Sequence, residues 1–211
     1  MAEMYGIFVG GYMVDMPLIV ARGLTPATAE QVTDLRLTGE LEFYTFYDTA
    51  TGIAYSGGKQ DRFKILPFSE DLAKIRASTA LFNGGIRRSQ DYYDSLGGRE
   101  FTRRDMILGK RLKEEDALKH EGWLAALNDN QDLLERLVDH VFRELHNRGF
   151  IPEGMPFCLR DEQAIPSIHA LLLTDFYDGV GARDSRELHE TYCVQLVVMQ
   201  PNGAESDSPT F

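Results

Sequence analysis

The chain has 211 residues, of which 43% are hydrophobic and 26% charged, which is typical of a globular protein able to bury a core without metals or disulfides. Its formal net charge of −11 argues against binding to the phosphates of nucleic acids, which requires clustered lysine and arginine. The apolar runs are shorter than the roughly 20 residues that cross a bilayer. Two cysteines, Cys158 and Cys193, do not make a disulfide framework. We therefore expect a cytoplasmic protein or a component of an intracellular complex.

The first third of the chain is rich in aromatic and β-branched residues and predicts strands. Residues 4–14 have the composition of a strand, with a pair of glycines as a bulge. Residues 25–37 begin with a Thr-Pro pair that favours a helix start, and they predict a short helix. Alternating aromatic residues in 40–48 and 53–58, around a Thr/Gly turn, predict a β-hairpin. Residues 61–68 would add a third strand.

The middle of the chain changes to helical patterns. Residues 69–85 predict a helix with Ser69 as its N-cap and apolar residues on one face. Residues 102–127 predict one or two helices with glycines as breaks. Residues 128–150 show the clearest helical pattern, because acidic residues begin it, basic residues end it, and a wide apolar stripe follows one face. The stripe consists of Leu133, Leu134, Leu137, Val138, Val141, Phe142 and Leu145.

The last third returns to strands. Residues 167–177 and 191–200 are nearly continuous apolar runs, which predicts two central strands of a sheet. Residues 201–211 have the composition of a disordered tail. We therefore expect an α+β fold in which an antiparallel or mixed sheet combines the N-terminal meander with the two C-terminal strands, around a helical middle at about 69–149. We expect residues 1–200 to form one domain.

Carboxylates and a histidine cluster in the connection between the two C-terminal runs. Such groups suit Mg²⁺, Mn²⁺ or Ca²⁺, and less often Zn²⁺. The spacing matches no EF-hand loop, and the Asp-Gly turn chemistry equally favours a solvated connection. A divalent metal here would make the protein a metal-dependent hydrolase or transferase. The candidate metal ligands are Asp175, Asp178, Asp184 and His189.

Basic and acidic side chains are separated along the middle of the chain. Residues 87–113 hold eight basic side chains against four acidic ones, whereas residues 114–139 hold eight acidic side chains against two basic ones. This separation favours either internal salt bridges or a head-to-tail assembly surface. Tyrosine and arginine are enriched among the residues that dominate protein interfaces. The interface candidates are Tyr92, Tyr93, Arg99, Arg103, Arg104 and Arg111.

Complete catalytic motifs are absent from the sequence, and we assign no catalytic residue. Residues 52–60 resemble a phosphate-binding loop but have the wrong spacing, so a phosphate site there would require Lys59 to face a pocket. We expect a protein–protein interaction or assembly protein without a cofactor, which acts as a subunit of a larger complex, a homo-oligomer, or an acidic inhibitor or adaptor. This reading leans away from an enzyme, and the metal-dependent enzyme is the alternative.

Overall fold

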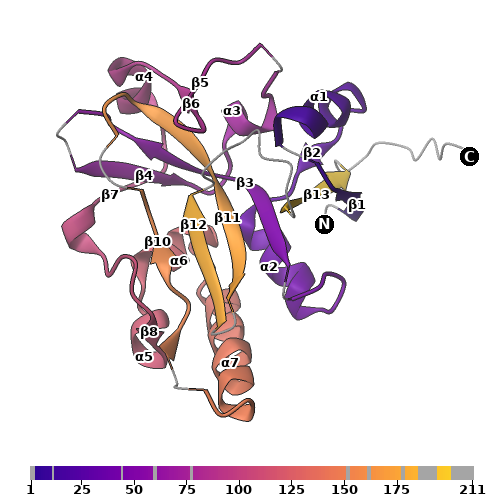
Figure 1. Ribbon diagram of the computed structural model, residues 1–211, viewed down its shortest axis with the longest axis vertical. Coiled ribbons are helices and arrows are strands. Elements are labelled where there is room, and N and C mark those ends of the chain that lie inside the picture. The colour runs from indigo at the N-terminus through magenta and orange to yellow at the C-terminus, as the bar shows by residue number, and fades with distance from the viewer. Residues whose placement is uncertain are drawn as a thin grey trace, which may run out of the picture.

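The computed structural model contains a large mixed sheet with helices on both faces (Figure 1). The structure describes residues 3–10, 12–43, 45–58, 61–76, 78–150, 153–160, 163–176, 179–184 and 194–200. In this part of the chain, the main path of the sheet runs in the order β1 (Glu3–Phe8), β13 (Val194–Gln200), β3 (Phe46–Tyr55), β11 (Ser167–Phe176), β12 (Gly179–Asp184) and β10 (Phe157–Cys158). The sheet is mixed, because β13 is parallel to β3 and β10 is parallel to β12.

Shorter strands and seven helices complete the described fold. Off the main path lie β2 (Thr25–Pro26), β4 (Arg62–Leu66), β5 (Leu81–Phe82), β6 (Gly85–Arg87) and β7 (Arg99–Thr102), while β8 (Leu112–Lys113) and β9 (Glu153–Gly154) form a separate small sheet. The helices are α1 (Tyr12–Ala21), α2 (Ala29–Leu37), α3 (Glu70–Ala73), α4 (Gln90–Ser95), α5 (Glu114–Ala117), α6 (Glu121–Ala126) and α7 (Gln131–Asn147), with a 3₁₀ turn at Arg103–Asp105. None of the helices within the described ranges combines the length and the apolarity that crossing a bilayer needs.

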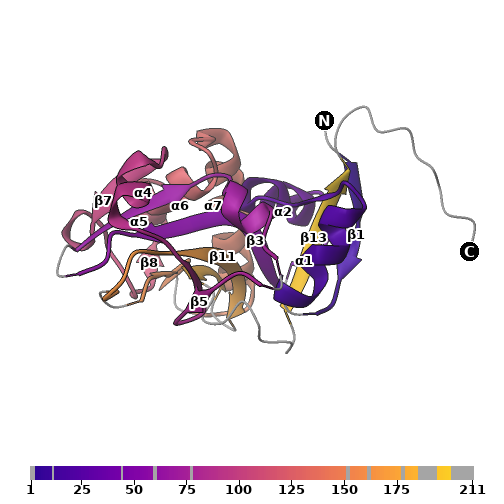
Figure 2. The same cartoon turned by 90° about the horizontal axis from the view of Figure 1, so that it is seen from above.

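Two apolar cores lie on the two faces of the sheet. Alternate residues of a strand point to opposite faces, and in β13 Val197 belongs to one core while Leu196 and Val198 belong to the other. The first core is covered by α2, α6 and α7, and the second by α1, α3 and α4. In both views β1 and α1 lie at one end of the molecule, while α4 and β7 lie toward the other end (Figures 1 and 2).

The α+β class and the strongest sequence patterns are confirmed. The helix predicted at 128–150 is α7, and all seven residues of its apolar stripe are buried. The two apolar runs of the last third are β11 and β13, and both have a strand on each side. Ser69 caps α3 as predicted, because its Oγ accepts a hydrogen bond from the backbone N–H of Leu72.

The hairpin predicted at 40–48 and 53–58 is wrong, because one continuous strand, β3, runs through the expected turn. Its threonines bond to distant segments and thereby hold the extended backbone. Thr49 Oγ1 donates to the carbonyl of Leu171 at 2.7 Å, and Thr51 Oγ1 donates to the carbonyl of Pro67 at 2.9 Å. The observed hairpin is formed by β3 and β4, so the turn lies several residues later than predicted.

The prediction for residues 4–14 is correct only as far as Phe8, where β1 ends. Helix α1 follows, because Tyr12, Met16 and Ile19 recur at helical spacing and are buried together in the second core. The next helix also begins later than predicted. Its N-cap is Thr28, whose hydroxyl and the side chain of Gln31 form a reciprocal capping box.

The middle of the chain is less helical than predicted. Helix α3 ends at Ala73, and the hairpin of β5 and β6 follows, with Asn83 and Gly84 in its turn at φ values of 49° and 77°. Residues 102–127 form a 3₁₀ turn, β8, α5 and α6 in place of long helices. The acidic connection near 175–190 contains a strand that the sequence analysis missed, β12, and residues 201–211 lie outside the described residues.

Candidate functional site

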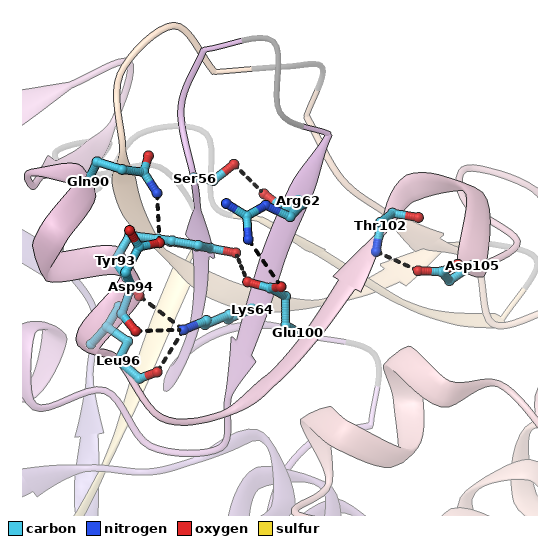
Figure 3. Close-up of polar contacts among 10 residues, drawn as sticks. All are labelled: Ser56, Arg62, Lys64, Gln90, Tyr93, Asp94, Leu96, Glu100, Thr102 and Asp105. Carbon is cyan, nitrogen blue, oxygen red and sulfur yellow. Dashed lines mark hydrogen bonds and ion pairs between the residues drawn. The ribbon is translucent and has the colours of Figure 1, made fainter.

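Helix α4 is held in place by polar groups at both of its ends. At its start, the Oγ of Ser89 accepts a hydrogen bond from the backbone N–H of Tyr92 at 3.1 Å. At its end, Nζ of Lys64 on β4 donates to the carbonyls of Tyr93, Asp94 and Leu96 at 3.0, 3.5 and 2.8 Å (Figure 3). A helix of six residues is not stable alone, so these contacts decide where its side chains lie.

Tyr93 anchors α4 to the sheet and is not available to a partner. Its side chain is 1% exposed, and its hydroxyl donates to Oε2 of Glu100 at 3.0 Å (Figure 3). The ammonium group of Lys64 lies 4.8 Å from the centre of its ring. Burial, and then the Glu100 carboxylate, raise the pKa of Tyr93. The prediction of Tyr93 as an interface residue is therefore corrected, because its side chain belongs to the second core.

Tyr92, the preceding residue, lies on the outer side of α4 and contacts α3. Its hydroxyl donates to Oδ2 of Asp71 at 2.8 Å, and Arg88 forms an ion pair with the other carboxylate oxygen of Asp71. The guanidinium of Arg88 lies 5.2 Å from the centre of the Tyr92 ring. Both oxygens of Asp71 are thus occupied within the chain, and three side chains from two helices and a loop form one hydrogen-bonded group.

An open cleft of about 610 Å³ lies over this group. We call it the α3–α4 cleft, and its lining residues are Asp71, Ala80, Arg87, Arg88, Ser89 and Tyr92. The exposed guanidinium of Arg87 has no hydrogen bond or ion pair to the residues that the structure describes. Since the carboxylate of Asp71 neutralises the charge of Arg88, the positive charge of Arg87 remains uncompensated among the lining residues, in a chain of net charge −11. Such a site can bind a carboxylate through Arg87, with Ser89 as a second donor.

The other interface candidates lie outside the α3–α4 cleft. Arg99 forms ion pairs with Glu121 and with Asp129, so the basic and acidic segments are joined within the chain at this point. Arg103 pairs with Asp61, whereas Arg104 and Arg111 are exposed. Of the residues that line the cleft, Tyr92 was predicted from the sequence as an interface residue, whereas Arg87 and Arg88 were not. The available signal was the order Arg-Arg-Ser, because a capping serine places the residues before it at a helix start.

Asp184, one of the four candidate metal ligands, is buried against a cation of the protein itself. It is 4% exposed, its Oδ2 accepts a hydrogen bond from the Tyr55 hydroxyl at 3.0 Å, and Nε of Arg160 lies 3.1 Å from the same oxygen. Burial raises the pKa of Asp184 to about 6, although Arg160 opposes this rise. The contacts of Asp184 are those of a buried structural carboxyl group.

The strand register also separates Asp184 from Asp175. Asp175 pairs with Val180 across β11 and β12, whereas Asp184 pairs with Leu171, four residues away along the strand and hence about 13 Å at roughly 3.3 Å per residue. The backbones of Asp175 and Asp184 thus lie at different levels of the β11–β12 pair. Asp178 and His189 lie outside the described residues. Within those residues, no group of three or more His, Cys, Asp or Glu side chains is placed to hold a metal.

The predicted phosphate loop has no support in the described residues. Residues 52–55 lie inside β3 and are buried, so they do not form an open loop that could surround a phosphate. Lys59 lies outside the described residues.

Comparisons with known proteins show the fold. No family model matches the chain, and no curated protein matches it. A solved structure described as "Accommodation of massive sequence variation in Nanoarchaeota by the C-type lectin fold" is similar, with a TM-score of 0.65 and 12% sequence identity over 95% of this chain and 98% of that chain. The chain is therefore similar in fold to a C-type lectin-fold protein, an α+β architecture.

Proposed function

We propose that the protein is a protein-binding module that captures a carboxylate side chain of a partner protein in the α3–α4 cleft. The observation that carries this proposal is the exposed, uncompensated guanidinium of Arg87 beside the hydrogen-bonded group of Arg88, Asp71 and Tyr92. Arginine and tyrosine are enriched among the residues that contribute most to binding energy. A guanidinium also binds a carboxylate through two parallel hydrogen bonds, which gives direction to the contact.

The charge of the whole chain limits what kind of partner fits. A net charge of −11 repels a strongly acidic protein at long range, so a partner of neutral or basic overall charge is favoured. Such a partner would place a single aspartate or glutamate into the α3–α4 cleft. The open shape of the cleft suits a side chain that protrudes from a protein surface. The similarity to a C-type lectin fold is compatible with a binding role.

Peptide selection tests this proposal without a known partner. We expect peptides selected on the full chain from a random display library to contain an aspartate or glutamate flanked by neutral or basic residues. Arg87→Glu should weaken their binding at least tenfold, because it replaces the free guanidinium by a like charge. The measurement is the dissociation constant of synthetic selected peptides, determined by fluorescence anisotropy.

Arg104→Glu is the matched control, because Arg104 is an exposed arginine outside the α3–α4 cleft and the substitution changes the net charge equally. We expect this variant to bind the peptides as the unmodified chain does. Equal losses in both variants would show that net charge alone attracts the peptides. Selected peptides without an acidic residue would contradict the proposed use of the cleft.

A further inference from the structure

Exposed apolar side chains gather at the N-terminal end of the molecule. Ten large hydrophobic side chains of the described residues are exposed, and six of them lie within the first 20 positions. We call these six the N-terminal apolar surface: Tyr5, Ile7, Val9, Val14, Leu18 and Val20. They belong to β1, to α1 and to the turn between them, which both views place at the same end of the molecule (Figures 1 and 2).

Strand β1 is an edge of the sheet with little protection against pairing with another strand. Among the described strands it pairs only with β13, and it is the first strand in the order of the sheet. Proteins protect such edges with lysine, proline, inward-pointing charges or β-bulges. Between Met4 and Val9 the chain has no lysine, proline or charge, and Glu3 is the only charged residue of the strand. A register shift between Met4 and Gly6 is the one such feature of β1. The backbone groups and side chains of this edge suit pairing with another apolar strand.

Helix α1 is apolar on its outer side as well as on its inner side. Tyr12, Met16 and Ile19 are buried in the second core, whereas Val14 and Leu18 are exposed one helical turn apart. Asp15 is the only charged residue of the helix. A helix that is hydrophobic all round is normally buried on all sides in the complete structure. The outer side of α1 therefore needs a cover of its own.

We propose that a second copy of this chain covers the N-terminal apolar surface, with β1 of each copy pairing antiparallel about a twofold axis. Two identical strands in antiparallel pairing are related by this axis, so a single arrangement provides hydrogen-bond partners for the free edges of both copies. The sheet would then continue from one copy into the other, and Leu18 of one α1 would lie near the other α1. This proposal is independent of the α3–α4 cleft.

The distribution of charge along the chain favours a second copy as the partner that covers this surface. Residues 3–22 contain two acidic residues and one basic residue, so nearly all of the net charge of −11 lies elsewhere in the chain. Two copies that meet at this surface bring together a part of the chain with little charge, so like-charge repulsion between the copies is small there.

The area also fits a stable homodimer. Taking roughly 150 Å² per side chain, the lower end of the range for aromatic residues, the six exposed fractions correspond to at most about 470 Å² of apolar surface. A standard interface buries about 800 Å² on each partner, and homodimer interfaces are about 65% apolar, which corresponds to about 520 Å². The N-terminal apolar surface thus supplies a large share of the apolar part of such an interface.

Sedimentation equilibrium of the untagged full chain over a wide concentration range tests the proposal. We expect a monomer–dimer equilibrium that Ile7→Lys and Leu18→Lys each weaken at least tenfold. Phe150→Lys is the matched control, because Phe150 is exposed to nearly the same degree as Ile7 and lies beyond α7. A monomeric chain, or a dimer that tolerates both lysines, would overturn the proposal. A chain that dimerises only after removal of residues 201–211 would overturn it too, since that segment would then be the cover.

Cysteine cross-linking tests the twofold pairing itself. Single cysteines are placed at Tyr5, Gly6, Ile7 and Val9 of a chain in which both native cysteines are replaced by serine. Gly6 accepts a side chain, since a Cβ there would have no atom within 4 Å. In antiparallel pairing, identical residues meet only near the axis, so one position should cross-link efficiently and Val9 should not. Equal cross-linking at all four positions would indicate parallel pairing and contradict the twofold arrangement.

Discussion

Replacing Lys64 by methionine is expected to lower the free energy of unfolding by about 3 kcal/mol. Hydrogen bonds to charged groups contribute about 1.5–3 kcal/mol each, and the buried carbonyls would lose their donor. The Lys64 side chain is 8% exposed and its ammonium group serves three carbonyls at the end of α4. Methionine keeps the length of the aliphatic chain and removes only the donor. The measurement is urea denaturation followed by the fluorescence of Trp123, the only tryptophan.

Lys74→Met provides the control for this experiment. Lys74 is exposed and pairs with Glu70 on the surface of α3, so its replacement is expected to change stability by less than about 0.5 kcal/mol. We also expect Lys64→Met to weaken peptide binding to the α3–α4 cleft, because α4 carries Tyr92. Equal stability of the two variants would show that the carbonyls at the end of α4 do not depend on Lys64.

Stability is expected to fall as the pH rises through 6, because of Asp184. Burial raises the pKa of this carboxyl group to about 6 in the folded chain, against an ordinary value of 3.8, so the folded state binds the proton more tightly than the unfolded state. The stabilisation from this proton is complete below about pH 4 and is lost as the pH rises through 6. A difference of about 2 pKa units corresponds to about 3 kcal/mol.

Asp184→Asn isolates this effect, since asparagine has a similar shape and does not titrate. Between pH 4 and 8 the unmodified chain should lose about 3 kcal/mol of stability relative to the variant, measured by urea denaturation at a series of pH values. Burial lowers the pKa of His120, whose contribution changes in the opposite direction, but it is present in both chains and cancels in the difference. Parallel pH profiles for the two chains would contradict the raised pKa of Asp184.

Sequence patterns predicted those elements whose position depends on local periodicity. The stripe of α7 and the apolar runs of β11 and β13 are complete within short windows, and all three were located correctly. The path of β3 depends on a hydrogen bond between Thr49 and Leu171, residues 122 positions apart. No local pattern contains such a contact, so a Thr/Gly sequence typical of a turn was placed wrongly.

The candidate site shows the same limit. Tyr92 and Tyr93 are adjacent and chemically identical, yet the first lines the α3–α4 cleft and the second is buried. Consecutive residues of a helix point in directions about 100° apart, and only the positions of Lys64 and Glu100 on neighbouring strands decide which ring faces inward. The separation of charge was visible in the sequence, but the pairing of Arg99 with Glu121 and Asp129 required the fold.

The place of β13 between β1 and β3 has a consequence for how the chain folds during synthesis. The last described strand lies beside the first (Figure 2), and Glu3 pairs with Gln200. At roughly 5–20 residues per second, a ribosome needs about 10–40 s to make the chain between them. During that time β1 has no strand to pair with, and its apolar residues remain available to other contacts. Contacts between such distant segments also slow folding, so β1 joins the sheet only after β13 has been synthesised.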